Sequence, residues 1–409
     1  MPTALRHRDF RHFWTGAVLS GVGSQFTIVA MAWQIYELTD SPLQIGLLGL
    51  ARAVPQMLLF ALGGLLADAF DRRRLLIISQ LAQFAVSGSL VIATAMGAVT
   101  PSVLFLASGC LALFTALETP PRQALVPSLV PPEDLGSALA LNTTLRHVGT
   151  IVGPSLAGVL LALSGAAWCY AVDAVSWLAM LGAVLAIAAR SPSAGGLQMM
   201  TLSALREALI FVRQHPIILW FMVLDFAATF FGSTRALLPI YARDVFAVGA
   251  AGLGWLYAAE SVGSVVAAVV LSRLSLVRHT GRWVLLGVGL YGTCIVLFAL
   301  SSSLVLSMLM LVGTGVGNTI GAVLRGTINQ LSTPDQLRGR VAAVNSVFTQ
   351  GGPQLGQFES GAVAEVWGTQ ISALSGGVAT LLVVGALALM PSIRGFKLIP
   401  ATDIARPAV

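Results

Sequence analysis

Residues 63–74 read GGLLADAFDRRR and join two long apolar runs, one from residue 44 and one starting at residue 75. The glycines allow close packing at the end of the first run. Asp68 places a carboxylate where it can accept charge-assisted hydrogen bonds. Three arginines between apolar runs are typical of a cytoplasmic loop in a membrane protein. This topology explains the arginines, but it does not explain the Gly-x-x-x-Asp spacing before them.

The whole chain is too apolar for a soluble globular protein. Of its 409 residues, 56% are hydrophobic and 10% are charged, whereas an average soluble domain is about 25% charged. A membrane-spanning helix needs about 20 apolar residues, and the apolar runs are of that length. They are continuous, whereas transmembrane β-strands alternate over about ten residues. The first run, 13–38, is too long for a cleaved signal peptide.

We predict an all-α membrane protein with twelve transmembrane helices in two pseudo-symmetric halves of six. The expected spans are 13–38, 44–69, 75–97, 102–121, 136–163, 166–189, 217–241, 252–275, 283–301, 304–328, 339–366 and 369–390. The predicted organisation is a first half (1–189), a cytoplasmic linker (190–216), a second half (217–393) and a cytoplasmic tail (394–409). Most of the 23 Lys and Arg residues then lie on the cytoplasmic side, as do both termini. The net charge of +6 therefore reflects topology rather than nucleic-acid binding.

The linker and an internal repeat refine this organisation. Within the linker, Leu202, Leu205, Leu209 and Val212 recur at helical spacing, which predicts an amphipathic helix at the membrane interface, with a regulatory contact as the alternative. The sequences PEDL (132–135) and PDQL (334–337) are each followed by an asparagine and then by Gly-Pro. Two parallel six-helix halves are one of the repeat arrangements of secondary transporters.

The loop between the second and third spans resembles the loop motif of the major facilitator superfamily. The matching positions are Gly64, Ala67, Asp68, Arg72 and Arg73, and the sequence departs from the usual pattern at positions 69 and 71. The resemblance implies that Asp68 latches one half against the other. It would engage the start of the eleventh span, where the candidate partners are Arg338 and Arg340.

A second pattern lies in the fifth span, at Gly149, Gly153, Pro154 and Gly158. Small residues at these spacings allow close helix approach, and the proline removes a backbone hydrogen bond and bends the helix. Close packing alone would explain the pattern. It also resembles the antiporter motif of exporters in the superfamily, although alanines replace glycines at positions 140 and 157.

The wider sequence is similar to the enterobactin-exporter-like branch of the superfamily. The supporting stretches are residues 5–14, 36–42, 119–127, 337–341 and 356–361. The resemblance implies a monomeric, proton-coupled exporter in the bacterial inner (plasma) membrane that works by alternating access. Its partners would be protons, membrane lipid and a small-molecule cargo, either a siderophore or an amphipathic drug-like compound.

Ionisable residues inside the spans are candidates for the mechanism, because a charge buried in lipid normally faces a cavity or a partner. These residues are Arg52, Arg146, Asp173, Asp225, Arg235, Glu260 and Glu359. In the superfamily arrangement, span two neighbours span eleven and span five neighbours span eight. We therefore expect Arg52 to pair with Glu359, and Arg146 with Glu260, in one state of the transport cycle. Glu260 would take up a proton when its arginine moves away; fixed ion pairs are the alternative.

The seventh span lines the central cavity in this fold, so Asp225 is expected to meet a cationic cargo or a proton. The other residues expected at the cargo cavity are Trp33, Gln34, Phe230 and Arg235. Core packing or lipid contact is the alternative for the aromatic side chains.

Several classes of function find no support in the sequence. A phosphate-binding Walker loop and a His-Glu-x-x-His zinc motif are missing, so we expect neither ATP as energy source nor a metal or other cofactor. We see no spacing of a nucleophile and base, so we do not expect an enzyme. The alternatives that stay open are a uniporter, a lysophospholipid transporter and a non-transporting membrane sensor.

Overall fold

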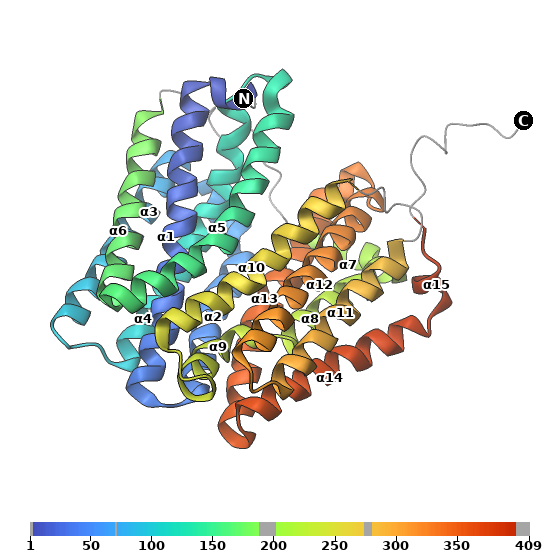
Figure 1. Cartoon of the computed structure of the whole chain (residues 1–409). Coiled ribbons are helices and arrows are strands. Elements are labelled where there is room, and N and C mark those ends of the chain that lie inside the picture. The colour runs from blue at the N-terminus through green and yellow to red at the C-terminus, as the bar shows by residue number, and fades with distance from the viewer. Residues whose placement is uncertain (1–2, 70–71, 188–201, 274–279, 398–409) are drawn as a thin grey trace, which may run out of the picture. The chain divides into compact units, whose positions relative to one another are not determined.

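The computed structural model describes residues 3–69, 72–187, 202–273 and 280–397, and the regular elements in them are helical. The longer helices are α1 (Arg8–Thr39), α2 (Pro42–Ala69), α3 (Arg72–Ala95), α4 (Pro101–Leu125), α5 (Leu135–Ser164), α6 (Ala166–Ala186), α7 (Leu202–Gln214), α8 (Pro216–Phe231), α10 (Gly249–Arg273), α11 (Thr280–Leu300), α12 (Leu304–Leu331), α13 (Asp335–Trp367) and α14 (Thr369–Ala388). The short elements are η1 (Thr3–Arg6), η2 (Val126–Ser128), η3 (Pro132–Asp134), η4 (Thr234–Ala236), α9 (Leu238–Ile240), η5 (Tyr241–Val245) and α15 (Pro391–Arg394). The predicted all-α class is confirmed (Figure 1).

Within the described residues the predicted spans fall on helices, except that 217–241 covers α8 and then the short elements η4 and α9 and the start of η5. Within the described residues, nine helical stretches are long and apolar enough to cross a membrane. In α5 a shorter apolar segment, Val152–Ser164, is found instead. The count of twelve crossings and the cytoplasmic location of both termini stay predictions.

The helix ends follow the local turn chemistry of the sequence. Thr100 caps α4, because its Oγ1 accepts a hydrogen bond from the Val103 amide (3.4 Å), and Pro101 occupies the first helical position. Gly165 joins α5 to α6 with φ +83°, and Gly368 joins α13 to α14 with φ +89°. Glycine tolerates this left-handed region without steric cost. The two equivalent joints support the internal repeat inferred from the sequence.

The chain forms two compact units. The first contains Met1–Met199 and Pro239–Ala258, and the second contains Met200–Leu238 and Ala259–Val409. Helix α10 therefore begins in the first unit and ends in the second. The structure groups residues 239–258 with the first unit, and the predicted division into halves at 1–189 and 217–393 stays a prediction. The start of the linker and the end of the tail, residues 190–201 and 398–409, lie outside the described residues.

In the first unit, α1 packs between α5 and α6, while α3 contacts both α4 and α6 (Figure 1). Phe10 and Phe13 of α1 are fully buried in an apolar cluster with Leu76 of α3 and Met180 of α6. Glycines bring these helices together. A Cβ atom on Gly153 of α5, for example, would lie 2.6 Å from the Cβ atom of Gln25 on α1. Close approach of this kind drives helix association in lipid, where apolar burial gains little.

In the second unit, α11 packs against α12 and α14, and α8 packs against α13 and α14. The buried side chains of this core include Phe221, Leu224, Val284, Val288 and Ile328. This packing places the polar positions of α8, α12 and α13 near one another, as the site described below requires.

The predicted amphipathic helix of the linker is present as α7. Its Ala208 and Val212 are buried against Val341 and Val344 of α13, while Leu209 is 49% exposed. One part of its apolar face therefore packs on protein and another part is exposed, while its location at the membrane interface stays a prediction.

A Gly153→Val substitution is expected to destabilise the first unit by about 1–3 kcal/mol, because an added side chain overlaps Gln25 at a close helix contact. The melting temperature of the purified protein in detergent measures this effect. The matched control is Gly88→Val in α3, where a Cβ atom meets nothing within 4 Å. Equal melting temperatures for the two variants would contradict the close packing of α5 on α1.

The contact between His7 and Asp134 ties the start of the chain to the start of α5. Their side chains lie 2.7 Å apart, and hydrogen bonds from His7 and Thr3 hold the pKa of Asp134 below its ordinary value. A depressed carboxyl pKa contributes stability above the unfolded pKa, about 3.9, and loses it as the pH falls through the folded value. Asp134→Asn is therefore expected to lower the melting temperature more at pH 6 than at pH 3. An equal difference at both pH values would refute this.

Candidate functional site

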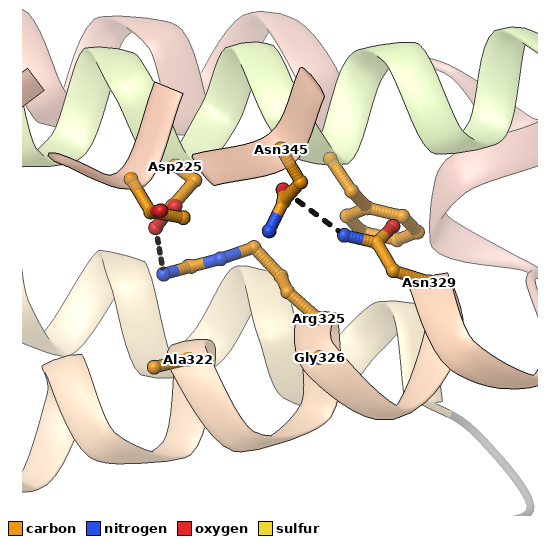
Figure 2. A pocket seen from close by; sticks show the side chains of 8 residues that line it. Asp225, Ala322, Arg325, Gly326, Asn329 and Asn345 are labelled. Atoms are coloured by element: carbon orange, nitrogen blue, oxygen red, sulfur yellow. Dashed lines mark hydrogen bonds and ion pairs between the residues drawn. The ribbon is translucent and has the colours of Figure 1, made fainter. Parts of the chain in front are cut away.

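The most deeply buried ion pair among the described residues joins α8 to α12 in the second unit. Arg325 donates a hydrogen bond from Nη2 to Oδ1 of Asp225 (Figure 2). The side chains are 6% and 11% exposed, respectively. Desolvating two charges costs several kcal/mol per ion, and removing one partner leaves the other uncompensated. These two residues therefore depend on each other.

A polar cavity of about 80 Å³ lies beside this pair. Its lining comes from α8, α12 and α13 and consists of Phe221, Asp225, Ala322, Arg325, Gly326, Asn329, Asn345 and Thr349. Asn329 donates from Nδ2 to Oδ1 of Asn345 (3.2 Å), so a second polar pair sits next to the ion pair (Figure 2). The volume suits a few water molecules or one small polar group, since sites for whole drug-sized ligands start near about 300 Å³.

The sequence of α12 explains how an arginine fits into this cavity. Gly321, Arg325 and Asn329 are spaced by four residues and so lie on one helix face. A Cβ atom on Gly321 would lie 2.6 Å from Nη1 of Arg325. The glycine therefore leaves room for the guanidinium to lie along its own helix.

A second ion pair joins η4 to α10. Arg235 donates from Nε to Oε2 of Glu260 (3.3 Å) and from Nη2 to Oε1 (3.4 Å), which is a two-bond arrangement with long hydrogen bonds. Arg235 is 43% exposed and Glu260 is 16% exposed. Nearby, Tyr291 of α11 donates to the carbonyl of Gly232 (2.6 Å). Tyr291 lies within electrostatic range of both ion pairs.

In the structure, Glu260 and Arg52 contact residues other than the partners that the sequence predicted for them. Glu260 pairs with Arg235, and the sequence identified both residues as charges within predicted spans. The side chain of Arg146 lies outside the described part of the structure. Arg52 of α2 donates from Nε to Oγ of Ser108 on α4 (3.2 Å). The pairs Arg52–Glu359 and Arg146–Glu260 combine residues of the two units and stay predictions.

The predicted latch is described only in part. Helices α2, α3 and α13 contain Gly64, Asp68, Arg72 and Arg338, whose side chains lie outside the described part of the structure. Arg73 donates from Nη2 to the carbonyl of Leu185 (3.1 Å). Arg340 forms an ion pair with Glu207 of α7. A role for these residues in latching stays a prediction.

The remaining predicted cargo residues pack within their own units. Trp33 is 8% exposed, and Gln34 accepts a hydrogen bond from the hydroxyl of Tyr170 (2.8 Å). Phe230 stacks on Phe226 with ring centroids 5.5 Å apart.

The motif residues of the fifth span lie in α5 at close helix contacts. A Cβ atom on Gly149 would lie 3.0 Å from the carbonyl oxygen of Gly21, and one on Gly158 would overlap Gly254 of α10. Pro154 lies inside the helix between them.

Sequence reasoning missed Arg325, Asn329 and Asn345 as site residues. Arg325 lies near the end of the predicted span 304–328, where membrane topology alone accounts for an arginine. The available signal was the four-residue spacing of Gly321, Arg325 and Asn329, which places a small and two polar residues on one face. Within the described residues, no group of three potential metal ligands is found.

Comparisons with known proteins agree with this architecture. The chain is 26% identical over 400 residues to the enterobactin exporter EntS of Shigella boydii serotype 18, covering 96% of this chain and 94% of that protein. Among solved structures, a bacterial homologue of the human lysosomal transporter Spinster, inward-facing and unoccupied, superposes with a TM-score of 0.75. It is 14% identical, with 98% of this chain and all of that chain covered. A D-xylose–proton symporter gives a TM-score of 0.71 at 15% identity, with coverage of 95% and 99%.

Both structural neighbours show the fold alone, because their identity to this chain is low. The family comparison goes further, since residues 2–407 match the family described as transmembrane secretion effector. The chain therefore belongs to this family of major facilitator superfamily transporters.

Proposed function

We propose that the protein is a secondary active exporter of a small molecule, coupled to protons, in the bacterial inner membrane. The main support for this proposal is the buried Asp225–Arg325 pair, which lies beside a cavity in the second unit. Buried charges in membrane helices mark substrate or ion pathways. The direction of transport rests on the relatives, which are named exporters.

The ion pairs give this exporter a physical means of responding to cargo and protons. A cargo group or proton that engages one partner of a buried pair weakens the pair and leaves the other partner uncompensated. A ligand can shift a conformational equilibrium only by the difference in its affinity for the two states. Exchange of partners at a buried ion pair supplies such a difference in affinity. The cargo group or proton that replaces one partner can reach the pair in one conformational state and not in the other.

Glu260 is our candidate for the proton-coupling group. It sits in α10, and its partner Arg235 is 43% exposed, so solvent reaches this pair more easily than it reaches Asp225–Arg325. A proton on Glu260 removes one charge of the pair and releases Arg235 from a two-bond contact. The coupling step would thus be separate from the buried pair beside the cavity.

The cargo we propose is a siderophore or an amphipathic drug-like compound, by analogy with the named relatives. The cavity of about 80 Å³ would hold one group of such a molecule and not the whole of it. The alternatives are transport of lysophospholipids and sensing without transport. Each predicts that the wild type exports no siderophore and no dye.

Glu260→Gln is expected to abolish gradient-driven efflux, because an amide cannot take up the coupling proton. Proteoliposomes loaded with enterobactin or with a panel of dyes report efflux with and without a pH gradient. The matched control is Glu133→Gln in the exposed η3 segment. Wild-type rates in the Glu260 variant would move the coupling to Asp225 or to no carboxylate. Efflux of none of the compounds by the wild type would favour lipid transport or sensing.

Asp225→Asn is expected to cost about 3–5 kcal/mol of stability, because it leaves the buried Arg325 charge uncompensated. The double variant Asp225→Asn/Arg325→Gln removes both charges and should recover most of that stability while transport stays at least tenfold below wild type. Melting temperature and efflux, measured on the same samples, separate the two effects. A double variant that transports at the wild-type rate would show that the pair is purely structural.

A further inference from the structure

We propose that the cavity beside Arg325 is a subsite for an oxyanion group of the cargo, a carboxylate or a phosphate. The guanidinium N–H groups that Asp225 leaves unused would hold this group. The subsite rests on the proposed function, because only an exporter has a cargo. It adds the chemical class of the cargo group that the cavity recognises. The sequence had suggested a cationic partner for Asp225; the paired arginine shifts the expectation to an anion.

The donors that support this subsite are buried and unused. Arg325 is 5% exposed, and neither Nε nor Nη1 has a hydrogen-bond partner within the described residues. A guanidinium carries five N–H donors, and the described contact with Asp225 uses Nη2 alone. A buried donor without a partner is unfavourable, so a ligand that accepts these hydrogen bonds recovers that cost.

The neighbouring amides complete a polar wall. Asn329 and Asn345 face the cavity together with Arg325, and Oδ1 of Asn329 also has no partner within the part of the chain described here (Figure 2). Thr349 lines the same space. An oxyanion with a hydrogen-bond donor beside it would satisfy both the arginine and the asparagine. Planar guanidinium groups suit carboxylate and phosphate oxygens better than an ammonium does.

Charge and size limit how this subsite can work. Asp225 and Arg325 sum to zero charge, so a bound oxyanion shares the guanidinium with Asp225 and is partly repelled by it. We therefore expect millimolar affinity for an isolated group, which suits a cargo that must be released. The volume of about 80 Å³ admits the charged group and leaves the rest of the cargo outside the cavity.

The test measures binding of [14C]benzoate to the purified full-length protein in phosphatidylcholine nanodiscs by equilibrium dialysis, with inorganic phosphate as competitor. Wild type is expected to bind benzoate saturably at one site, and phosphate is expected to displace it. Arg325→Lys keeps the charge but loses the planar donor set, and it should weaken binding at least tenfold. The matched control is Arg282→Lys at an exposed position of α11, where affinity should stay within twofold of wild type.

A second variant tests the same subsite in case Arg325→Lys does not fold. Gly321→Ala places a methyl group against Nη1 of Arg325 without changing any charge, and it should also weaken benzoate binding severalfold. Absence of saturable binding to the folded wild type, or unchanged binding in both Arg325→Lys and Gly321→Ala, would overturn the proposal. Loss of benzoate binding when phosphatidylglycerol is added to the nanodiscs would assign the subsite to a lipid headgroup and overturn its role for cargo.

This assay needs no proton gradient, so its failure is distinguishable from failure of the proposed function. Benzoate binding without any gradient-driven efflux would leave the subsite standing and refute the exporter. If the protein catalyses efflux but Arg325→Lys binds benzoate with wild-type affinity, the subsite is refuted and the proposed exporter function is not.

Discussion

The cost of placing a charge in an apolar helix core governs where the charged side chains of this protein lie. In the second unit, Asp225 meets Arg325 and Glu260 meets Arg235, so each of these four charges has an opposite one in contact. Because half a pair is much less stable than a whole one, neither residue of a pair can change its partner or its proton without affecting the other. Such mutual dependence is what a carrier needs in order to sense its cargo.

Glycine makes this arrangement of charges possible. Gly321 leaves the space in which the Arg325 guanidinium lies, and in the first unit Gly149 and Gly153 let α5 approach α1 closely. In lipid, helices associate through such contacts rather than through burial of apolar surface. The same residue type therefore serves two purposes, since it sets helix spacing in one place and shapes the cavity beside Arg325 in another.

The sequence was sufficient to predict the helices and part of the site. Apolar runs predicted the helix positions, and the helical spacing of Leu202, Leu205, Leu209 and Val212 falls within α7. Asp225, Arg235 and Glu260 were identified because charges are rare within such runs. Their partners were not predictable, since a contact between α8 and α12 depends on tertiary packing that no local pattern encodes. Arg325 was missed because membrane topology already accounted for an arginine near the end of a span.

The separation of the two ion pairs bears on how cargo and proton communicate. Tyr291 donates to the carbonyl at the end of α8, the helix that carries Asp225, and lies within electrostatic range of all four charges. In the proposed mechanism, a proton on Glu260 and an oxyanion beside Arg325 would each change the electrostatic field at Tyr291. Interactions of this kind are strong in a low-dielectric interior. In the proposed mechanism, coupling would therefore need no shared binding group, only a helix end that responds to both pairs.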